Sequence, residues 1–103
     1  MIQIQSVQAR VRAGVAFLDA VYGQAWRKKV NVGNLRLQSS QSCPLGQTDG
    51  NYEDHKKLLG LTNKSAFNLG FHANKSGRWK DATSEAWREL TNAWKKALRK
   101  KRA

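Results

Sequence analysis

The clearest structural signal in the chain is the segment from residue 81 to residue 102, DATSEAWRELTNAWKKALRKKR. Its apolar side chains recur at spacings of three and four residues, which places them on one face of an α-helix. They are Trp87, Leu90, Trp94 and Leu98. Asp81 or Thr83 stands where a helix cap is needed, and Glu85 follows in the first turn, where a carboxylate suits the helix dipole. The segment therefore predicts a long amphipathic helix.

A second long helix is predicted from Ser6 to Gly23. Its apolar residues also follow a spacing of three and four, and they are Val7, Val11, Val15, Leu18 and Tyr22. Ser6 is suited to cap the start and Gly23 to end it. Residues 24–30 are expected to continue as a short helix that carries Trp26. We expect the first long helix to pack on the last one.

The middle of the chain gives weaker signals. Val32–Leu37 alternates apolar and polar residues, as a short strand does, and Gln38–Asn51 is rich in Ser, Gln and Gly and is expected to be a loop. A short helix is predicted at Tyr52–Leu61, with Asn51 or Asp49 as its cap. A further helical turn is expected at Ser65–Leu69, closed by Gly70, and a loop at Asn74–Lys80.

These elements predict one small domain, residues 1–103. Its fold class is mainly α, or α+β with a minimal β element, with a long N-terminal helix packed on the amphipathic C-terminal helix. A chain of 103 residues suits a single domain, and an apolar content of 40% with four tryptophans argues against disorder. The predicted core consists of Val11, Val15, Leu18, Trp26, Leu58, Phe71, Trp87, Leu90 and Trp94.

The charge of the chain is unusual for its size. Nineteen Lys and Arg stand against seven Asp and Glu, a net charge of +12. Residues 75–103 hold ten basic and three acidic side chains, a net of +7. A surface with this charge attracts polyanions, so the sequence suits a nucleic acid, an anionic membrane or an acidic protein as partner.

Three basic clusters are the candidate nucleic-acid contacts, since Lys and Arg neutralise phosphates without reading sequence. The first is Arg27, Lys28 and Lys29; the second is Lys75, Arg78 and Lys80, with Trp79 among them; the third is Lys95, Lys96, Arg99, Lys100, Lys101 and Arg102, in the basic end of the last helix, 95–103. Among the four tryptophans, Trp79 is the best candidate for an exposed ring that could stack on a base. The alternative is that the basic end is only a solvated, solubilising segment.

Enzymatic motifs are missing from the sequence. Cys43 is the single cysteine, which excludes an internal disulfide and a multi-cysteine zinc site. With His55 or His72 it could form an activated thiolate, but a small buried side chain is the simpler interpretation. No phosphate-binding loop and no metal-ligand spacing is present. We therefore expect no catalysis, no cofactor and no metal.

The segment Cys43–Gly50 has two interpretations. Gly46 and Gly50 permit positive φ, so it can be a tightly folded structural turn. The alternative is an exposed recognition loop.

The sequence shows neither of two targeting signals. No run approaches the roughly 18 apolar residues of a membrane span, and the start of this sequence lacks the pattern of a signal peptide.

An ordered set of short motifs resembles small accessory proteins of phages that infect actinobacteria. The motifs are Phe17-Leu18-Asp19, Trp26, Val30, Cys43-Pro44-Leu45-Gly46-Gln47, Gly50-x-Tyr52, Leu69-Gly70-Phe71 and Leu90-Thr91-x-Ala93-Trp94. The resemblance spans residues 17 to 98. This chain is more basic than the members we expect. The resemblance implies a phage origin and the cytoplasm of the bacterial host, but it supplies no activity.

The leading functional hypothesis is a small basic phage-type protein that contacts nucleic acid, or a nucleic-acid-containing host machine, through basic helical surface. The alternative is an inhibitor or adaptor that docks on an acidic host protein. A third hypothesis, attachment to an anionic membrane, requires Trp87 and Trp94 to face lipid instead of the core. The oligomeric state is left open by the sequence.

Overall fold

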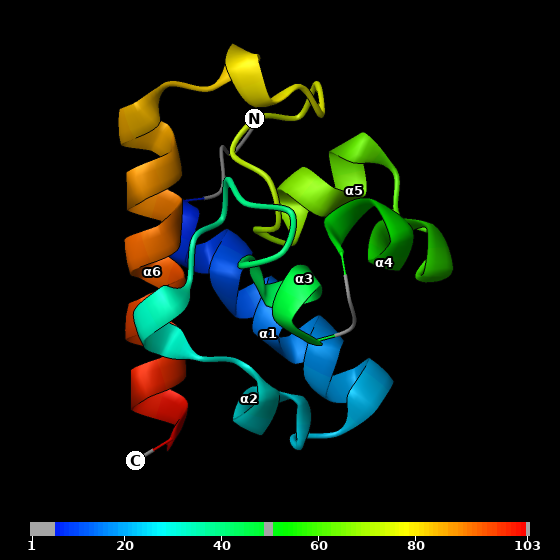
Figure 1. Ribbon diagram of the computed structural model, residues 1–103, viewed down its shortest axis with the longest axis vertical. Coiled ribbons are helices and arrows are strands. Elements are labelled where there is room, and N and C mark those ends of the chain that lie inside the picture. Colours follow the sequence, from blue (N-terminus) through cyan, green and yellow to red (C-terminus); the bar gives the residue numbers. More distant parts are fainter. Residues whose placement is uncertain (1–5, 49–50, 103) are drawn as a thin grey trace, which may run out of the picture.

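The computed structural model describes residues 6–48 and 51–102, and within them every regular element is helical (Figure 1). This part of the chain holds α1 (Val7–Tyr22), α2 (Trp26–Lys29), η1 (Val32–Asn34), α3 (Pro44–Thr48), α4 (Tyr52–Leu58), α5 (Asn63–Asn68), η2 (Trp79–Asp81) and α6 (Ser84–Arg102), where η marks a short 3₁₀ helix. In Figure 1, α6 runs along one side of the molecule and α1 crosses behind the short helices. The mainly α class is confirmed.

The two long helices pack together, as predicted, and they meet closely at Gly14. A Cβ atom on Gly14 would lie 2.0 Å from the carbonyl oxygen of Leu69 and 2.9 Å from the ring of Trp94. The indole N–H of Trp94 donates to the carbonyl of Gly70 at 2.6 Å, and its ring stacks on Phe71 with 5.7 Å between centroids. Only a residue without a side chain allows α1, α6 and the turn at 69–71 to come this close.

The predicted helix ends are largely confirmed. The Ser6 side chain accepts from the N–H of Ala9 to cap α1, which ends at Gly23 with a φ of 72°. Thr83, one of the two cap candidates, accepts from Ala86 at the start of α6. The expected short helix with Trp26 is α2.

The short central helices also begin at side-chain caps. The side chain of Asn51 accepts from Asp54 at the start of α4, while the other cap candidate, Asp49, lies outside the described residues. The turn expected at Ser65–Leu69 is α5, which begins earlier because Thr62 caps it. The loop expected at Asn74–Lys80 runs into the 3₁₀ turn η2.

The strand predicted at Val32–Leu37 is wrong. The Asn31 side chain accepts from the N–H of Gly33 at 3.0 Å, and this favours the 3₁₀ turn η1. The chain then extends with Leu35 and Leu37 buried, but the N–H of Leu37 bonds to the side chain of Thr91. No neighbouring strand is present among the described residues, so the alternation reflects an extended segment lying on a helix.

The loop predicted at Gln38–Asn51 contains the helix α3. Proline is tolerated in the first turn of a helix, and Pro44 begins this one. Gly46 does not have the expected positive φ; a Cβ there would lie 2.2 Å from the carbonyl oxygen of Ser40, so its role is close packing. The backbone of Gly50 lies outside the described residues. Burial of Cys43 to Gly46 supports the structural-turn interpretation.

The predicted core is confirmed except at Leu58, which is 69% exposed. In α4 and its C-cap, the buried Tyr52 and His55 and the partly buried Leu59 follow a spacing of three and four and share one face. Leu58 falls beside that face, at the end of the helix. Cys43 is buried, as its preferred interpretation predicts. Further buried apolar residues that are absent from the predicted core are Val30, Val32, Leu35, Leu37, Leu45, Tyr52, Ala66 and Leu98.

Candidate nucleic-acid interface

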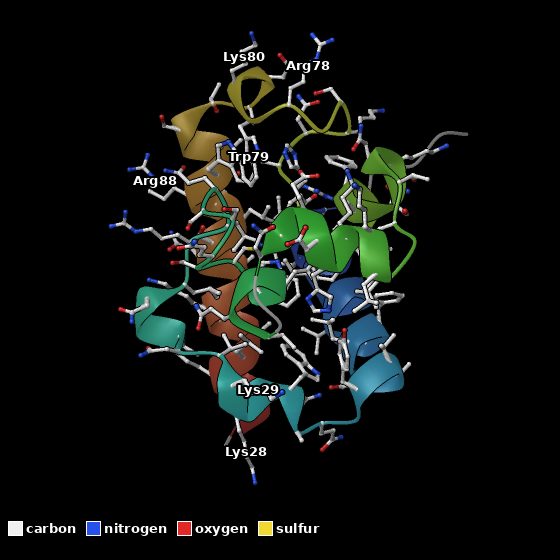
Figure 2. All side chains as sticks on the ribbon, turned by 45° about the vertical axis from the view of Figure 1, so that its right-hand side comes forward. Lys28, Lys29, Arg78, Trp79, Lys80 and Arg88 are labelled. Carbon is white, nitrogen blue, oxygen red and sulfur yellow. The ribbon has the colours of Figure 1, made fainter. Side chains whose placement is uncertain are left out.

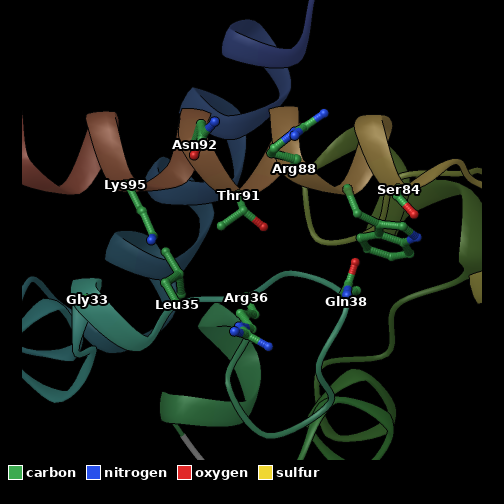
Figure 3. A pocket seen from close by; sticks show the side chains of 10 residues that line it. Gly33, Leu35, Arg36, Gln38, Ser84, Arg88, Thr91, Asn92 and Lys95 are labelled. Carbon is green, nitrogen blue, oxygen red and sulfur yellow. The ribbon is translucent and has the colours of Figure 1, made fainter.

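A polar groove of about 510 Å³ opens between α6 and the segment 33–38 (Figure 3). Three of its lining residues, Arg36, Arg88 and Lys95, are basic, and no described lining residue is acidic. The other lining residues are Gly33, Leu35, Gln38, Ser84, Trp87, Thr91 and Asn92. Cations from two separate parts of the chain therefore line one concave surface, although the guanidinium of Arg88 points away from the segment 33–38 (Figure 3).

The register of α6 builds one wall of the groove. Ser84, Arg88, Thr91 and Lys95 follow one another at spacings of four, three and four, so they form a single stripe beside the buried stripe of Trp87, Leu90 and Trp94. Figure 3 shows Thr91 and Lys95 pointing from α6 toward the opposite segment. α6 therefore contributes buried side chains to the core on one face and lining residues to the groove on the neighbouring face.

The alternation of residues 35 to 38 builds the other wall. Leu35 and Leu37 are buried, which leaves Arg36 and Gln38 exposed between and beyond them. The N–H of Leu37 donates to the hydroxyl of Thr91 at 3.0 Å, and the N–H of Arg36 donates to the carbonyl of Ser42 at 3.1 Å. This wall is held both by buried side chains and by backbone hydrogen bonds. In Figure 3, Gln38 points toward α6.

The predicted basic clusters lie far apart. Figure 2 places Lys28 and Lys29 at one end of the molecule and Arg78 and Lys80 at the other, along a longest dimension of 34 Å. All four side chains are exposed, as is Lys75. The clusters do not converge on one spot. Instead α6, which lines the groove from Ser84 to Lys95, runs lengthwise through the molecule (Figure 1).

Arg27 differs from its two neighbours in the first cluster. Its guanidinium pairs with the carboxylate of Asp19, with Nε 3.1 Å from Oδ1, and its side chain is only 11% exposed. Asp19 also accepts from the indole N–H of Trp26 at 2.8 Å. Arg27 therefore links α2 to α1. Within this cluster, the cations that are exposed to solvent are Lys28 and Lys29.

The third cluster is divided around α6. Lys95 lines the groove, whereas Lys96 lines a smaller hollow of about 190 Å³ near Arg12, between α1 and α6. Arg99 is exposed, one turn beyond Lys95. The helix continues to Arg102, but the side chains of Lys100, Lys101 and Arg102 and all of residue 103 lie outside the described part of the structure.

Trp79 is the most exposed of the four tryptophans, as predicted, but it is partly buried. Its ring stacks on Trp87 with 4.8 Å between centroids and also contacts His72 and Tyr52, at 4.9 and 5.6 Å. Trp87 occupies one face of this ring. Stacking on a base would have to use the opposite face.

Trp87 and Trp94 are buried, with 4% and 0% of their surfaces exposed. The membrane hypothesis requires both rings to face lipid. Because both are buried in the core, they do not form an apolar surface that could contact a membrane. Within the described residues, no helix combines the length and the apolar character needed to cross a bilayer.

Cys43 has the environment of a structural side chain. It is 1% exposed, its sulfur accepts from the N–H of Gly46 at 3.3 Å, and burial raises the pKa of the thiol to about 11. His55 is held by the carbonyl of Leu45 at 2.8 Å and by the hydroxyl of Tyr22. Among the described residues, no three His, Cys, Asp or Glu side chains gather as a metal site would require.

Two groove residues, Arg36 and Arg88, were not among the predicted contacts. Arg88 shares the stripe of Lys95, seven residues further on, and this spacing is visible in the sequence. The position of Arg36 opposite them depends on tertiary structure. The cation of Arg10 is directed inward, since its side chain is buried and donates to the carbonyl of Phe67 at 3.0 Å.

The chain matches no protein-family model, no curated protein and no solved structure. What the structure defines is a small helical domain with a cationic groove along its longest described helix.

Proposed function

We propose that this chain is a small, non-enzymatic, phage-type accessory protein that binds nucleic acid, or a nucleic-acid-containing machine, in the cytoplasm of a bacterial host. The observation that carries the proposal is that Arg36, Arg88 and Lys95 line one groove without an acidic residue in its described lining. The contacts are to phosphate groups.

Charge pairing supports this proposal. Among the described residues, the only pair of opposite charges within 4.0 Å is Arg27 with Asp19. The exposed Lys and Arg side chains are thus available to an external anion, and neutralising phosphates releases the counterions that nucleic acid condenses. Arg36 and Arg88 can each give a phosphate two parallel hydrogen bonds. The high pKa and burial of Cys43 support the non-enzymatic part of the proposal.

The second candidate is an adaptor or inhibitor that docks on an acidic host protein. The same cations suit such a partner, and Leu58, 69% exposed, offers it an apolar contact. Phosphate contacts are favoured because the cations line a polar groove, whereas Leu58 is a single side chain, and single exposed apolar residues are common on protein surfaces.

The test is a fluorescence-anisotropy titration of labelled single-stranded and duplex oligonucleotides at several salt concentrations. Three phosphate contacts predict a slope of log affinity on log salt of roughly −2 for a single strand. Absence of binding at low salt, or binding without a salt slope, would refute the proposal. A stoichiometric protein captured from nuclease-treated host lysate would favour the second candidate.

A further inference from the structure

The size of the groove and the residues that line it bear on whether it binds single-stranded or duplex nucleic acid. We infer that it holds one nucleotide of a single strand, with the phosphate on Arg36 and Lys95 and the edge of the base on the amide of Gln38. This inference rests on the proposed function and adds to it the class of nucleic acid and the place where it is bound.

The size of the groove favours a nucleotide unit. Its volume of about 510 Å³ falls in the range of about 300–1,000 Å³ that is usual for sites enclosing a small ligand. A duplex keeps its bases stacked inside and offers a protein mainly its outer backbone and groove edges. A single strand can instead turn one nucleotide out of its stack and into a concave site.

The charges of the groove lie on both walls. Arg36 belongs to the segment 33–38, while Arg88 and Lys95 belong to α6 (Figure 3). A phosphate between the walls can therefore be contacted by Arg36 from one side and by Lys95 from the other. Arg36 can give its oxygens a planar bidentate contact, whereas Arg88, whose guanidinium points away from the segment 33–38 (Figure 3), would have to change its rotamer to add one.

The groove also carries groups that can contact a base. The amide of Gln38 has both a donor and an acceptor, which is what the hydrogen-bonding edge of a base requires. Gln38 is exposed and points toward α6 (Figure 3). Asn92 offers a second amide among the lining residues. The cations would supply affinity, and these amides would supply a preference among bases.

The walls are fixed before a ligand arrives. Leu35 and Leu37 anchor one wall in the core with 1% and 0% exposure, and the bond from Leu37 to Thr91 ties it to the other wall. A site that is already ordered loses less conformational entropy on binding. This rigidity also means that removing the charge of Arg36 or Lys95 should leave the fold intact.

The first experiment compares two double variants that each remove two positive charges. Arg36→Gln/Lys95→Gln changes the groove, and Lys28→Gln/Lys29→Gln changes α2 at the end of the molecule. With a fluorescent oligothymidylate as probe, we expect the groove variant to weaken binding by about tenfold or more and the control by less than about threefold. Equal losses in the two variants would overturn the inference. Circular dichroism and thermal unfolding check that both remain folded.

The second experiment tests strand type and base contact. Oligothymidylate should bind more tightly than a duplex of equal length, and Gln38→Ala should change the affinity ratios among oligo-dA, oligo-dC and oligo-dT by about threefold or more without changing the salt slope. Duplex binding as tight as single-strand binding, or unchanged ratios, would overturn the inference. So would equally effective competition by polyglutamate of matched charge.

Failure of the inference can be told apart from failure of the proposed function. If the wild-type protein binds no oligonucleotide at low salt, both fail. If it binds with a normal salt slope but the groove variant behaves like the α2 variant, nucleic-acid binding stands and the nucleotide site in the groove is wrong.

Discussion

Leu37 and Thr91 lie 54 residues apart in the sequence, and the backbone N–H of Leu37 donates to the hydroxyl oxygen of Thr91 at 3.0 Å. Leu37 is completely buried, so water cannot readily replace the Thr91 hydroxyl as the acceptor for this N–H. This hydrogen bond joins the extended segment to α6, and together with the buried side chains of Leu35 and Leu37 it holds the two groove walls in place.

Replacing Thr91 with valine keeps the shape of the side chain and removes the acceptor for Leu37. We expect the free energy of unfolding to fall by about 1–3 kcal/mol, because a buried N–H is left without a partner. Urea denaturation measures this change. The matched control is Asn92→Ala, at an exposed neighbouring position of α6, with an expected change within about 0.5 kcal/mol. Similar stability of Thr91→Val and the wild type would contradict the role assigned to this bond.

Trp94 is the central residue of the contact between α1, α6 and the turn at 69–71. Trp94→Ala should lower the free energy of unfolding by about 3–5 kcal/mol, because a fully buried ring is lost and a cavity is left against Gly14 and Phe71. Leu58→Ala, at the exposed position on α4, serves as the control and should change it by about 0.5 kcal/mol or less. An unchanged melting temperature in Trp94→Ala would show that the core is placed wrongly.

Asp19 accepts hydrogen bonds from two side chains of α2, Trp26 and Arg27. Asp19→Ala should cost about 1–3 kcal/mol of stability, mainly because the indole N–H of the buried Trp26 loses its acceptor. Arg27→Gln should cost less, about 1 kcal/mol at most, since the Asp19 carboxylate is a quarter exposed and keeps the hydrogen bond from Trp26. Thermal unfolding ranks the two, with Glu89→Ala on the exposed face of α6 as control. The reverse order would show that the ion pair dominates this contact.

The two long helices could be predicted from sequence because a single periodic stripe specifies each. Val11, Val15 and Leu18 in one helix and Trp87, Leu90 and Trp94 in the other are all buried when the two stripes face the same core. Leu58 was misplaced because α4 is too short for its apolar residues to define a face. Its buried positions include His55, which the pattern counts as polar.

The groove could be predicted only in part. Arg88 and Lys95 share a helical stripe that the sequence displays, but the alternation at Val32–Leu37 predicts a strand, which is wrong. Alternation shows which side chains are buried and does not show what the segment packs against. Here the partner is α6, reached through Thr91, and this long-range contact alone brings Arg36 opposite Arg88. The same limit applies at position 46. The backbone of Ser40 leaves no room for a side chain there, and this tertiary contact cannot be predicted from the sequence around Gly46.

His72 should make stability depend on pH. Burial lowers its pKa below the ordinary 6.5, Lys56 lowers it further, and Glu53 opposes the shift. The folded state therefore takes up this proton less readily than the unfolded state. The contribution is fully present above about pH 6.5 and is lost as the pH falls below that value.

The variant His72→Asn isolates this effect. An asparagine oxygen can replace Nδ1 as acceptor for the N–H of Asn74, at 3.0 Å in the native protein, but it cannot take up a proton in this range. Urea denaturation of both proteins at several pH values between about 7 and 5 gives the two slopes. We expect the wild type to lose stability more steeply as the pH falls. Parallel slopes would mean that His72 does not titrate on unfolding in this range.

Cys43 provides a direct test of the non-enzymatic part of the proposed function. A thiol with a pKa of about 11 and 1% exposure holds almost no accessible thiolate near neutral pH, and the thiolate is the reactive form. A disulfide reagent such as Ellman's should therefore label the native protein slowly and the urea-unfolded protein at once. Trp94→Ala should be labelled faster than the wild type, because its unfolded population is larger, while Leu58→Ala should not. Rapid stoichiometric labelling of the native wild-type protein would instead reveal an exposed, activated thiolate, and catalysis through Cys43 would then become the better hypothesis.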